Sequence, residues 1–197
     1  MSKFVSLSVA GLLIGAAVPF VVAPAASQQI GEQVYTSCEH RFAVIYPGQP
    51  KTRDLQFTTT GGRTVPAREY LFKDAPDRFA VTVAVFPASS PAVDDAVVEN
   101  AAEQLRQKGG RINQQFKEPY DPGMPGRQLN ISYPNGKQLR SSIYMADRRL
   151  TITEATAAQS DFNALQFEQS ITLIDAKGDD LDRPNNNDPP RNFGCGG

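Results

Sequence analysis

The chain has little of the chemistry that metal centres and histidine-dependent enzymes require. Its 197 residues include one histidine, two cysteines and no tryptophan. A structural zinc site takes about four Cys, His or carboxylate ligands, and a Ser–His–Asp triad would have to recruit His40 without a Gly-x-Ser-x-Gly turn. Gly109-Gly110-Arg111 lacks the Lys-Ser/Thr of a phosphate-binding loop. The sequence therefore predicts no cofactor, no metal and no enzyme activity.

An excess of charge of either sign is also lacking. The formal net charge at pH 7 is −1. Residues 175–197 hold five Asp against three basic residues, and the remaining body after the first 25 residues is neutral. A neutral body has no long-range field that attracts polyanions, so we expect no nucleic-acid partner. The same argument disfavours binding to anionic lipid surfaces.

The N-terminus has the pattern of a secretory signal peptide. Lys3 precedes an apolar run over residues 4–22, and Ala23-Pro24-Ala25 is a small-x-small cleavage site. A retained membrane anchor is the alternative, but the run is short for a bilayer span and contains Pro19. We expect an exported protein, periplasmic or extracellular, without stable membrane insertion after cleavage.

Three segments follow from these patterns. We expect residues 1–25 to be the signal peptide, residues 26–174 to form one α+β domain, and residues 175–197 to form a Pro/Asn/Gly-rich C-terminal tail.

The two cysteines lie near the two ends of the mature chain. An exported protein with an even number of cysteines favours a disulfide between Cys38 and Cys195, which would hold the tail against the body. The functional alternative is a nucleophilic Cys38 activated by His40, since residues i and i+2 share a strand face. The oxidising compartment favours the disulfide.

Short runs of alternating or continuous apolar residues predict an antiparallel sheet. Residues 42–46 are apolar on both faces and predict a central strand, and residues 79–86 place Val side chains on one face and Ala on the other. Small residues on that second face would let a helix approach closely. Asn135-Gly136 is a strong hairpin signal. Further strands are expected near residues 55–57, 67–72, 111–116, 128–133, 139–145, 150–152 and 171–174.

One long and one short helix interrupt the strands. The long helix is expected from about Pro91 to Lys108, with Ser90 as N-cap and Gly109-Gly110 at its end. Ser160 is expected to cap the short helix, which includes Phe162 and Phe167. The predicted fold is therefore α+β, a single antiparallel β-sheet flanked by one long and one short helix.

Four segments, in this order along the chain, resemble exported bacterial proteins with a PsbP-like fold. Residues 42–51 are similar to the opening strand and "FPGxPK" turn, and residues 125–127 to the "PGRE" element with Gln128 in place of the acid. Residues 140–150 are similar to an arginine-bearing strand and "DRLY"-like hairpin. Residues 167–173 resemble the closing "FxxSFxL", with Ile in place of the second Phe.

The resemblance implies an α/β/α sandwich and a binding role. The fold is shared by extrinsic photosystem II subunits and a nuclear-import factor, which bind proteins rather than catalyse.

Two groups of residues are candidates for an interaction surface. Tyr120, Met124 and Arg127 combine an aromatic, a flexible apolar residue and a cation, as interface centres often do. Arg140, Arg148 and Arg149 could bind an anion. The structural alternatives are a loop that caps the sheet for the first group and solvated or paired arginines for the second.

The sequence therefore favours an exported, non-enzymatic envelope protein that binds another envelope protein. The alternative is a small-ligand-binding periplasmic protein with a pocket between the long helix and the sheet.

Overall fold

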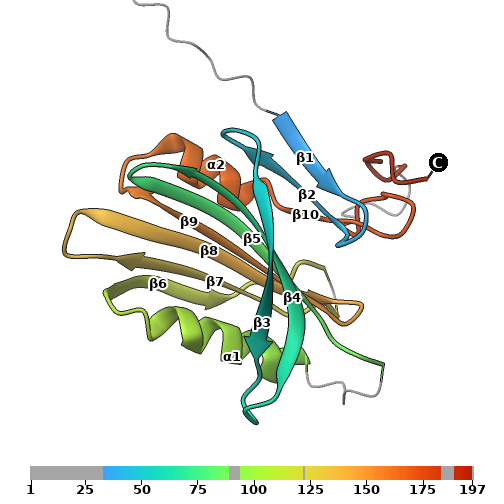
Figure 1. The fold of residues 1–197 in the computed structure, drawn as a ribbon, viewed down its shortest axis with the longest axis horizontal. Helices are drawn as coiled ribbons and strands as arrows, with labels where there is room; N and C mark the ends of the chain where they lie inside the picture. Colours follow the sequence, from blue (N-terminus) through green and yellow to red (C-terminus); the bar gives the residue numbers. More distant parts are fainter. Residues whose placement is uncertain (1–32, 89–93, 122, 183–188, 197) are drawn as a thin grey trace, which may run out of the picture.

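The structure is a computed structural model that describes residues 33–88, 94–121, 123–182 and 189–196. It contains two antiparallel sheets and two helices, α1 (Asp94–Arg106) and α2 (Phe162–Gln169), as Figure 1 shows. The small sheet has the order β1 (Gln33–Ser37), β2 (Phe42–Tyr46), β10 (Thr172–Leu173). The large sheet has the order β3 (Lys51–Thr58), β4 (Thr64–Asp74), β5 (Asp77–Val85), β9 (Arg149–Ala158), β8 (Lys137–Ala146), β7 (Gly126–Ser132), β6 (Arg111–Lys117).

The α+β class predicted from the sequence is confirmed, but the single sheet is corrected to two. The strand at residues 42–46 is central, as predicted, yet it is central in the small sheet, where β2 pairs with β1 on one side and β10 on the other. Phe42, Val44 and Tyr46 are almost completely buried. A strand that is apolar on both faces can be central in either sheet, so the pattern does not determine which sheet it joins.

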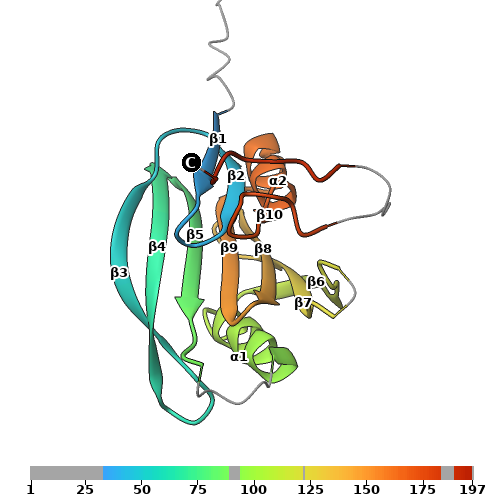
Figure 2. The same ribbon diagram turned by 90° about the vertical axis from the view of Figure 1, so that its right-hand side faces the viewer.

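The large sheet separates two apolar cores. On one face, α1 packs through Val98, Ala101, Ala102 and Leu105 against β7, β8 and β9. On the other face, α2 and the small sheet cover Phe79, Val81 and Val83 of β5 (Figures 1 and 2). Ala84 of β5 lies in the α1 core, where a small side chain leaves room for the helix, as the alternation along residues 79–86 predicted.

Helix ends and turns follow local chemistry. Gly109 and Gly110 adopt φ values of 85° and 96° after α1, the left-handed conformation that glycine accepts without strain. The start predicted for α1, with Ser90 and Pro91, lies outside the described residues. The cap of α2 is corrected from Ser160 to Asp161, whose Oδ1 accepts a 2.8 Å hydrogen bond from Ala164 N. Both side-chain types can cap, and Asp161 is the one at the N-cap position.

Residues 175–182 and 189–196 fold back along the body, and we call them the C-terminal strap. Leu181 N donates to Leu173 O at 2.9 Å, and Asp180 N donates to Arg191 O at 2.8 Å. The disulfide predicted between Cys38 and Cys195 is present, with a sequence separation of 157 residues. The disulfide thus joins the strap to the residue that follows β1 (Figure 2).

The signal peptide predicted at residues 1–25 lies outside the described residues and stays a prediction. Neither α1 nor α2 has the length and apolar character needed to cross a bilayer.

Candidate functional site

The residues predicted to form an interaction surface lie in different environments. Met124 lines an open hollow of about 720 Å³ together with Asp94 and Asp95, between the loop before β7 and the described start of α1. Arg148 is exposed in the two-residue turn between β8 and β9, where Asp147 and Arg148 have φ values of 45° and 58°.

Tyr120 holds the strap in place. Its hydroxyl donates to Asp180 Oδ1 at 2.8 Å and accepts from Leu173 N at 3.0 Å. Burial, and then the charge of Asp180, raise the pKa of Tyr120 far above its ordinary value, so the hydroxyl remains a donor. Tyr120 therefore contributes to the anchoring of the strap.

Three of the predicted arginines are engaged with carboxylates. Arg127 pairs with Glu99 of α1, and Arg149 Nη1 donates to Asp147 Oδ2 at 2.8 Å. Arg140 is partly buried on β8 and favours the charged form of Glu168. The alternative of paired arginines, made for the second group, describes Arg149, and Arg127 of the first group is paired as well.

Cys38 and His40 do not form a nucleophilic pair. Cys38 is in the disulfide and has no thiol. His40 is buried, and its Nδ1 lies 2.8 Å from the hydroxyl of Tyr70, which in turn lies 2.8 Å from Ser37 Oγ. Burial lowers the pKa of His40. These contacts link β1 to β4, and His40 therefore has the structural role of a polar residue beside a strand.

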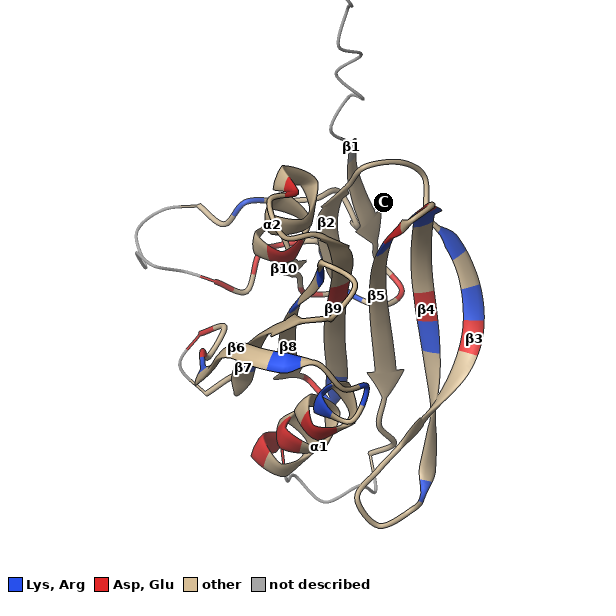
Figure 3. Ribbon diagram, turned by 90° about the vertical axis from the view of Figure 1, so that its left-hand side faces the viewer, with Lys and Arg blue, Asp and Glu red and all other residues tan. Residues whose placement is uncertain are grey.

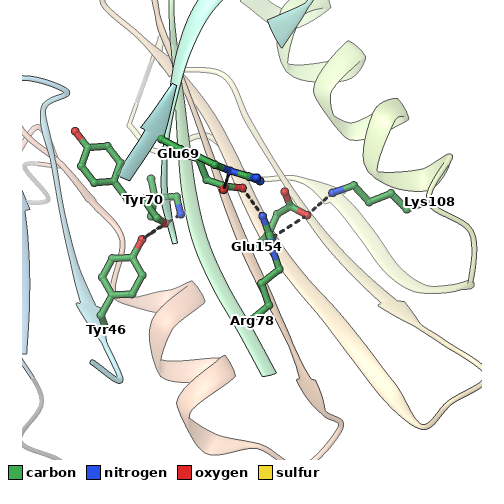
Figure 4. A network of polar contacts seen from close by, with 8 residues as sticks. Tyr46, Glu69, Tyr70, Arg78, Lys108 and Glu154 are labelled. Atoms are coloured by element: carbon green, nitrogen blue, oxygen red, sulfur yellow. Dashed lines mark hydrogen bonds and ion pairs between the residues drawn. The ribbon is translucent and has the colours of Figure 1, made fainter. Parts of the chain in front are cut away.

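An ion-pair chain that was not predicted crosses the α1 face of the large sheet (Figure 4). Glu69 of β4 pairs with Arg53 of β3 and Arg78 of β5. Arg78 also lies 3.7 Å from Glu154 of β9, which pairs with Lys108 beyond the end of α1. The Glu69 side chain is only 3% exposed. Without cationic partners, a carboxylate at this depth would lose its hydration without compensation.

The ion-pair chain borders a groove between α1 and the sheet. The groove has a volume of about 310 Å³. Its helix wall includes Ala101, Gln104 and Leu105, and its sheet wall includes Thr82 and Ile152. The two ends of the ion-pair chain are its most exposed members, with Arg53 59% and Lys108 47% exposed. The groove is at the position expected for a pocket between helix and sheet.

The two edges of the large sheet differ in charge. The edge strand β3 carries Lys51, Arg53 and Asp54, and charges of both signs appear along β3 and β4 in Figure 3. Charged side chains on an edge strand discourage pairing with another chain. At the opposite edge, β6 has cations only at its ends, Arg111 and Lys117, with uncharged residues between them. The interior of β6 therefore lacks the charged side chains that β3 carries.

Apolar side chains on β6 face solvent. Ile112 is 45% exposed and Phe116 is 44% exposed. No strand of the described ranges pairs with the outer side of β6, which is paired with β7 alone. A bulge between Ile112 and Gln114 is the one irregularity in the pairing, and Asn113 in the bulge donates to Asn130 Oδ1 at 2.7 Å.

An acidic hollow lies beside the end of β6. It has a volume of about 340 Å³, and its lining includes the carboxylates of Glu118, Glu168, Asp180 and Asp182. The rings of Tyr120 and Tyr144, which also line it, have centroids 5.2 Å apart. No Lys or Arg is among its described lining residues. Nowhere in the described ranges are three or more His, Cys, Asp or Glu side chains placed to hold a metal ion.

Glu168 is the buried member of this hollow. Desolvation raises the pKa of Glu168, while a hydrogen bond from Ser142 and the charge of Arg140 act in the opposite direction. The hydroxyl of Ser142 on β8 thus links the carboxylate of α2 to the sheet.

No protein-family model matches this chain, and no curated protein sequence matches it either. Among solved structures, the chain is similar to the solution structure of cyanobacterial PsbP (CyanoP) from Synechocystis sp. PCC 6803. The TM-score is 0.49 at 11% sequence identity, over 78% of this chain and 99% of that chain. A similarity of this degree assigns neither a family nor a function, so the resemblance seen in the sequence motifs stays a prediction.

Proposed function

We propose that the chain is an exported, non-catalytic protein-binding module that captures an extended segment of its partner by adding a strand to β6. The observation that carries the proposal is the open β6 edge, with Ile112 and Phe116 half exposed and no charge between Arg111 and Lys117. Main-chain hydrogen bonds provide affinity in strand addition, and alternate side chains provide specificity. Export is inferred from the sequence pattern of residues 1–25.

The register of β6 shows which backbone groups are free to bind a strand. Glu118 N donates to Gly126 O at 3.2 Å, which continues the pairing of Phe116 with Gln128. Hydrogen-bonded and non-hydrogen-bonded residue pairs alternate along two antiparallel strands. The N–H groups of Gln115 and Lys117 therefore point away from β7, toward the open edge. A partner strand would bond to these groups.

The test is selection of ten-residue segments from a displayed peptide library on the full chain, followed by hydrogen exchange on the complex. We expect the selected peptide to slow exchange at Gln115 and Lys117 and to leave β3 unchanged. Gln115→Pro removes an outward N–H without removing a bond to β7, and should weaken binding by about tenfold or more. Gln115→Ala is the matched control and should bind normally. Protection elsewhere, or unchanged binding to Gln115→Pro, would contradict the proposal.

The groove between α1 and the sheet supports a second candidate function, the binding of a small anionic ligand. The exposed ends of the ion-pair chain, Arg53 and Lys108, supply cationic groups at a groove with an apolar wall. Ligand-detected NMR with a set of small carboxylates tests this candidate. Saturation transfer that disappears in Lys108→Met and persists in Gln115→Pro would support it, whereas no transfer to any carboxylate would remove it.

A further inference from the structure

The charges around β6 indicate what kind of segment could add to it. Resting on the proposed function, we infer that the partner segment is basic, with an apolar residue beside Phe116 and a lysine or arginine two residues along that reaches the acidic hollow. This pattern requires both features. The position of the acidic hollow along the β6 edge sets the spacing between the apolar residue and the cation of the partner segment.

The geometry places Phe116 and the acidic hollow on one face of the sheet. Phe116 is paired with Gln128, and directly paired residues of an antiparallel ladder point to the same side. Gln128 lines the acidic hollow together with Tyr144. Glu118, two residues after Phe116, also lines it and continues the ladder to Gly126. Side chains alternate along a strand, so residues of an added strand opposite Phe116 and Glu118 are two apart.

The charge balance near this end favours a cation. Four carboxylates line the acidic hollow, and α1 on the opposite face carries Asp94, Asp95, Glu99 and Glu103 (Figure 3). The cations nearby on α1 and β7, Arg106 and Arg127, are already paired with α1 carboxylates. Arg140 favours the charged form of Glu168 but is not among the lining residues. An incoming lysine would therefore face carboxylates that form no ion pair with a Lys or Arg of the described residues.

Two tyrosine rings make the hollow suitable for an organic cation. Tyr120 and Tyr144 line it and contact each other edge to face at 5.2 Å. An ammonium or guanidinium group gains additional attraction from the face of an aromatic ring. A strand with a glutamate at this position would meet like charges instead, which disfavours the wrong partner.

Three synthetic peptides test the inference on the full chain. Each peptide has ten residues in which threonine and valine alternate. The three peptides differ at one position, two residues after a valine, where they carry a lysine, a glutamine or a glutamate. At an ionic strength of about 0.02 M we expect the lysine peptide to bind about tenfold more tightly than the glutamine peptide, with the glutamate peptide weakest. The preference should shrink toward about 0.5 M salt, because exposed charges are then screened.

Variants locate the preference. The double variant Glu118→Gln with Asp182→Asn removes two of the four carboxylates and should reduce the preference for the lysine peptide over the glutamine peptide. Asp74→Asn, at the exposed carboxylate of the last residue of β4, is the matched control and should keep the preference. Equal binding of the three peptides to the unmodified chain would overturn the basic partner and leave strand addition in place. A preference of unchanged size in the double variant would also overturn it. If no peptide protects β6 from exchange, both proposals fail.

Discussion

Arg78 is the central cation of the ion-pair chain and serves two carboxylates. It pairs with Glu69 and lies 3.7 Å from Glu154, while its own side chain is 29% exposed. Removing one member of a buried pair destabilises by about 3–5 kcal/mol when the partner is left alone. Here Arg53 and Lys108 still compensate the carboxylates, so we expect a smaller loss.

Arg78→Met should lower the free energy of unfolding by about 2 kcal/mol in urea titrations at neutral pH. Arg68→Met is the control, because Arg68 pairs with Asp54, whose side chain is 81% exposed, and should cost less than about 1 kcal/mol. Equal losses in the two variants would show that the burial of Glu69 does not determine how much the ion-pair chain contributes to the free energy of unfolding.

The position of Glu69 could have been recognised from the sequence. It lies between Ala67 and Leu71 on the apolar face of its strand, so a charge there predicts a buried, partnered carboxylate. Its partners could not be identified, because Arg53, Arg78, Glu154 and Lys108 are widely separated in the chain. Only the strand order β3-β4-β5-β9 brings them together.

Glu168 gives the stability a pH dependence with a definite sign. Burial raises its pKa above the ordinary 4.5. A carboxyl with a raised pKa in the folded state holds its proton longer there than in the unfolded chain. Its contribution is therefore favourable below pH 4.5 and is lost as the pH rises from 4.5 through the raised pKa. The loss is complete at pH values above that pKa.

Glu168→Gln removes this titration and keeps an acceptor for the hydroxyl of Ser142. We expect the variant to be more stable than the unmodified chain above the raised pKa, and its stability to vary less with pH above 4.5. Urea titrations at a series of pH values measure both effects. A variant that is less stable at neutral pH would show that the carboxylate charge, in the field of Arg140, is a net favourable feature.

At the scale of elements, the junction of β6 and β7 depends on a glycine. A Cβ at Gly126 would collide with the carbonyl oxygen of Glu118 and the ring of Tyr144. The first contact is backbone and cannot rotate away, so β6 would have to move relative to β7.

Gly126→Ala should therefore lower the free energy of unfolding by about 2 kcal/mol and weaken peptide binding at β6. Gly61→Ala is the matched control, because no atom lies within 4 Å of the added Cβ, and its stability should be nearly unchanged. Thermal or urea unfolding checks both. A tolerated Gly126→Ala would imply that β6 is free to shift without cost.

Individual strands and turns were more predictable than their assembly. Gly136, at φ 78°, lies in the turn that the local Asn135-Gly136 signal predicts. The small sheet was not expected, because β10 has only two residues and pairs with β2 across most of the chain length. The β1 segment was missed for a related reason, since its pairing with β2 is what identifies it as a strand. A local sequence pattern contains little information about strand pairing between distant segments of the chain.

At the scale of the whole molecule, the disulfide closes nearly the entire folded chain. Cys38 and Cys195 are separated by 157 residues. In the chain-entropy model a cross-link of this span stabilises by at most about 5 kcal/mol. It also fixes the strap, whose other described attachments include backbone bonds to β10, the hydroxyl of Tyr120 and the packing of Leu181 against the core.

The double variant Cys38→Ser with Cys195→Ser should lose several kcal/mol of stability, up to about 5 kcal/mol. We expect a protease to cut the strap before it cuts residues 33–174, because released residues are open to cleavage. Urea unfolding and mass spectrometry of the digest measure the two effects. Uniform cleavage of the whole body would contradict a strap that opens independently.

The disulfide and the pairing of β1 with β2 also bring the described ends of the chain to one side of the molecule. Gln33 begins β1 and Gly196 follows Cys195, and β1 and the C-terminal end lie away from β6 in the two views (Figures 1 and 2). A tether attached at Gln33 or Gly196 would therefore leave the β6 edge facing the bulk solution. Chains immobilised at these two positions should give the same peptide affinities, which makes surface-based measurements insensitive to the choice of attachment point.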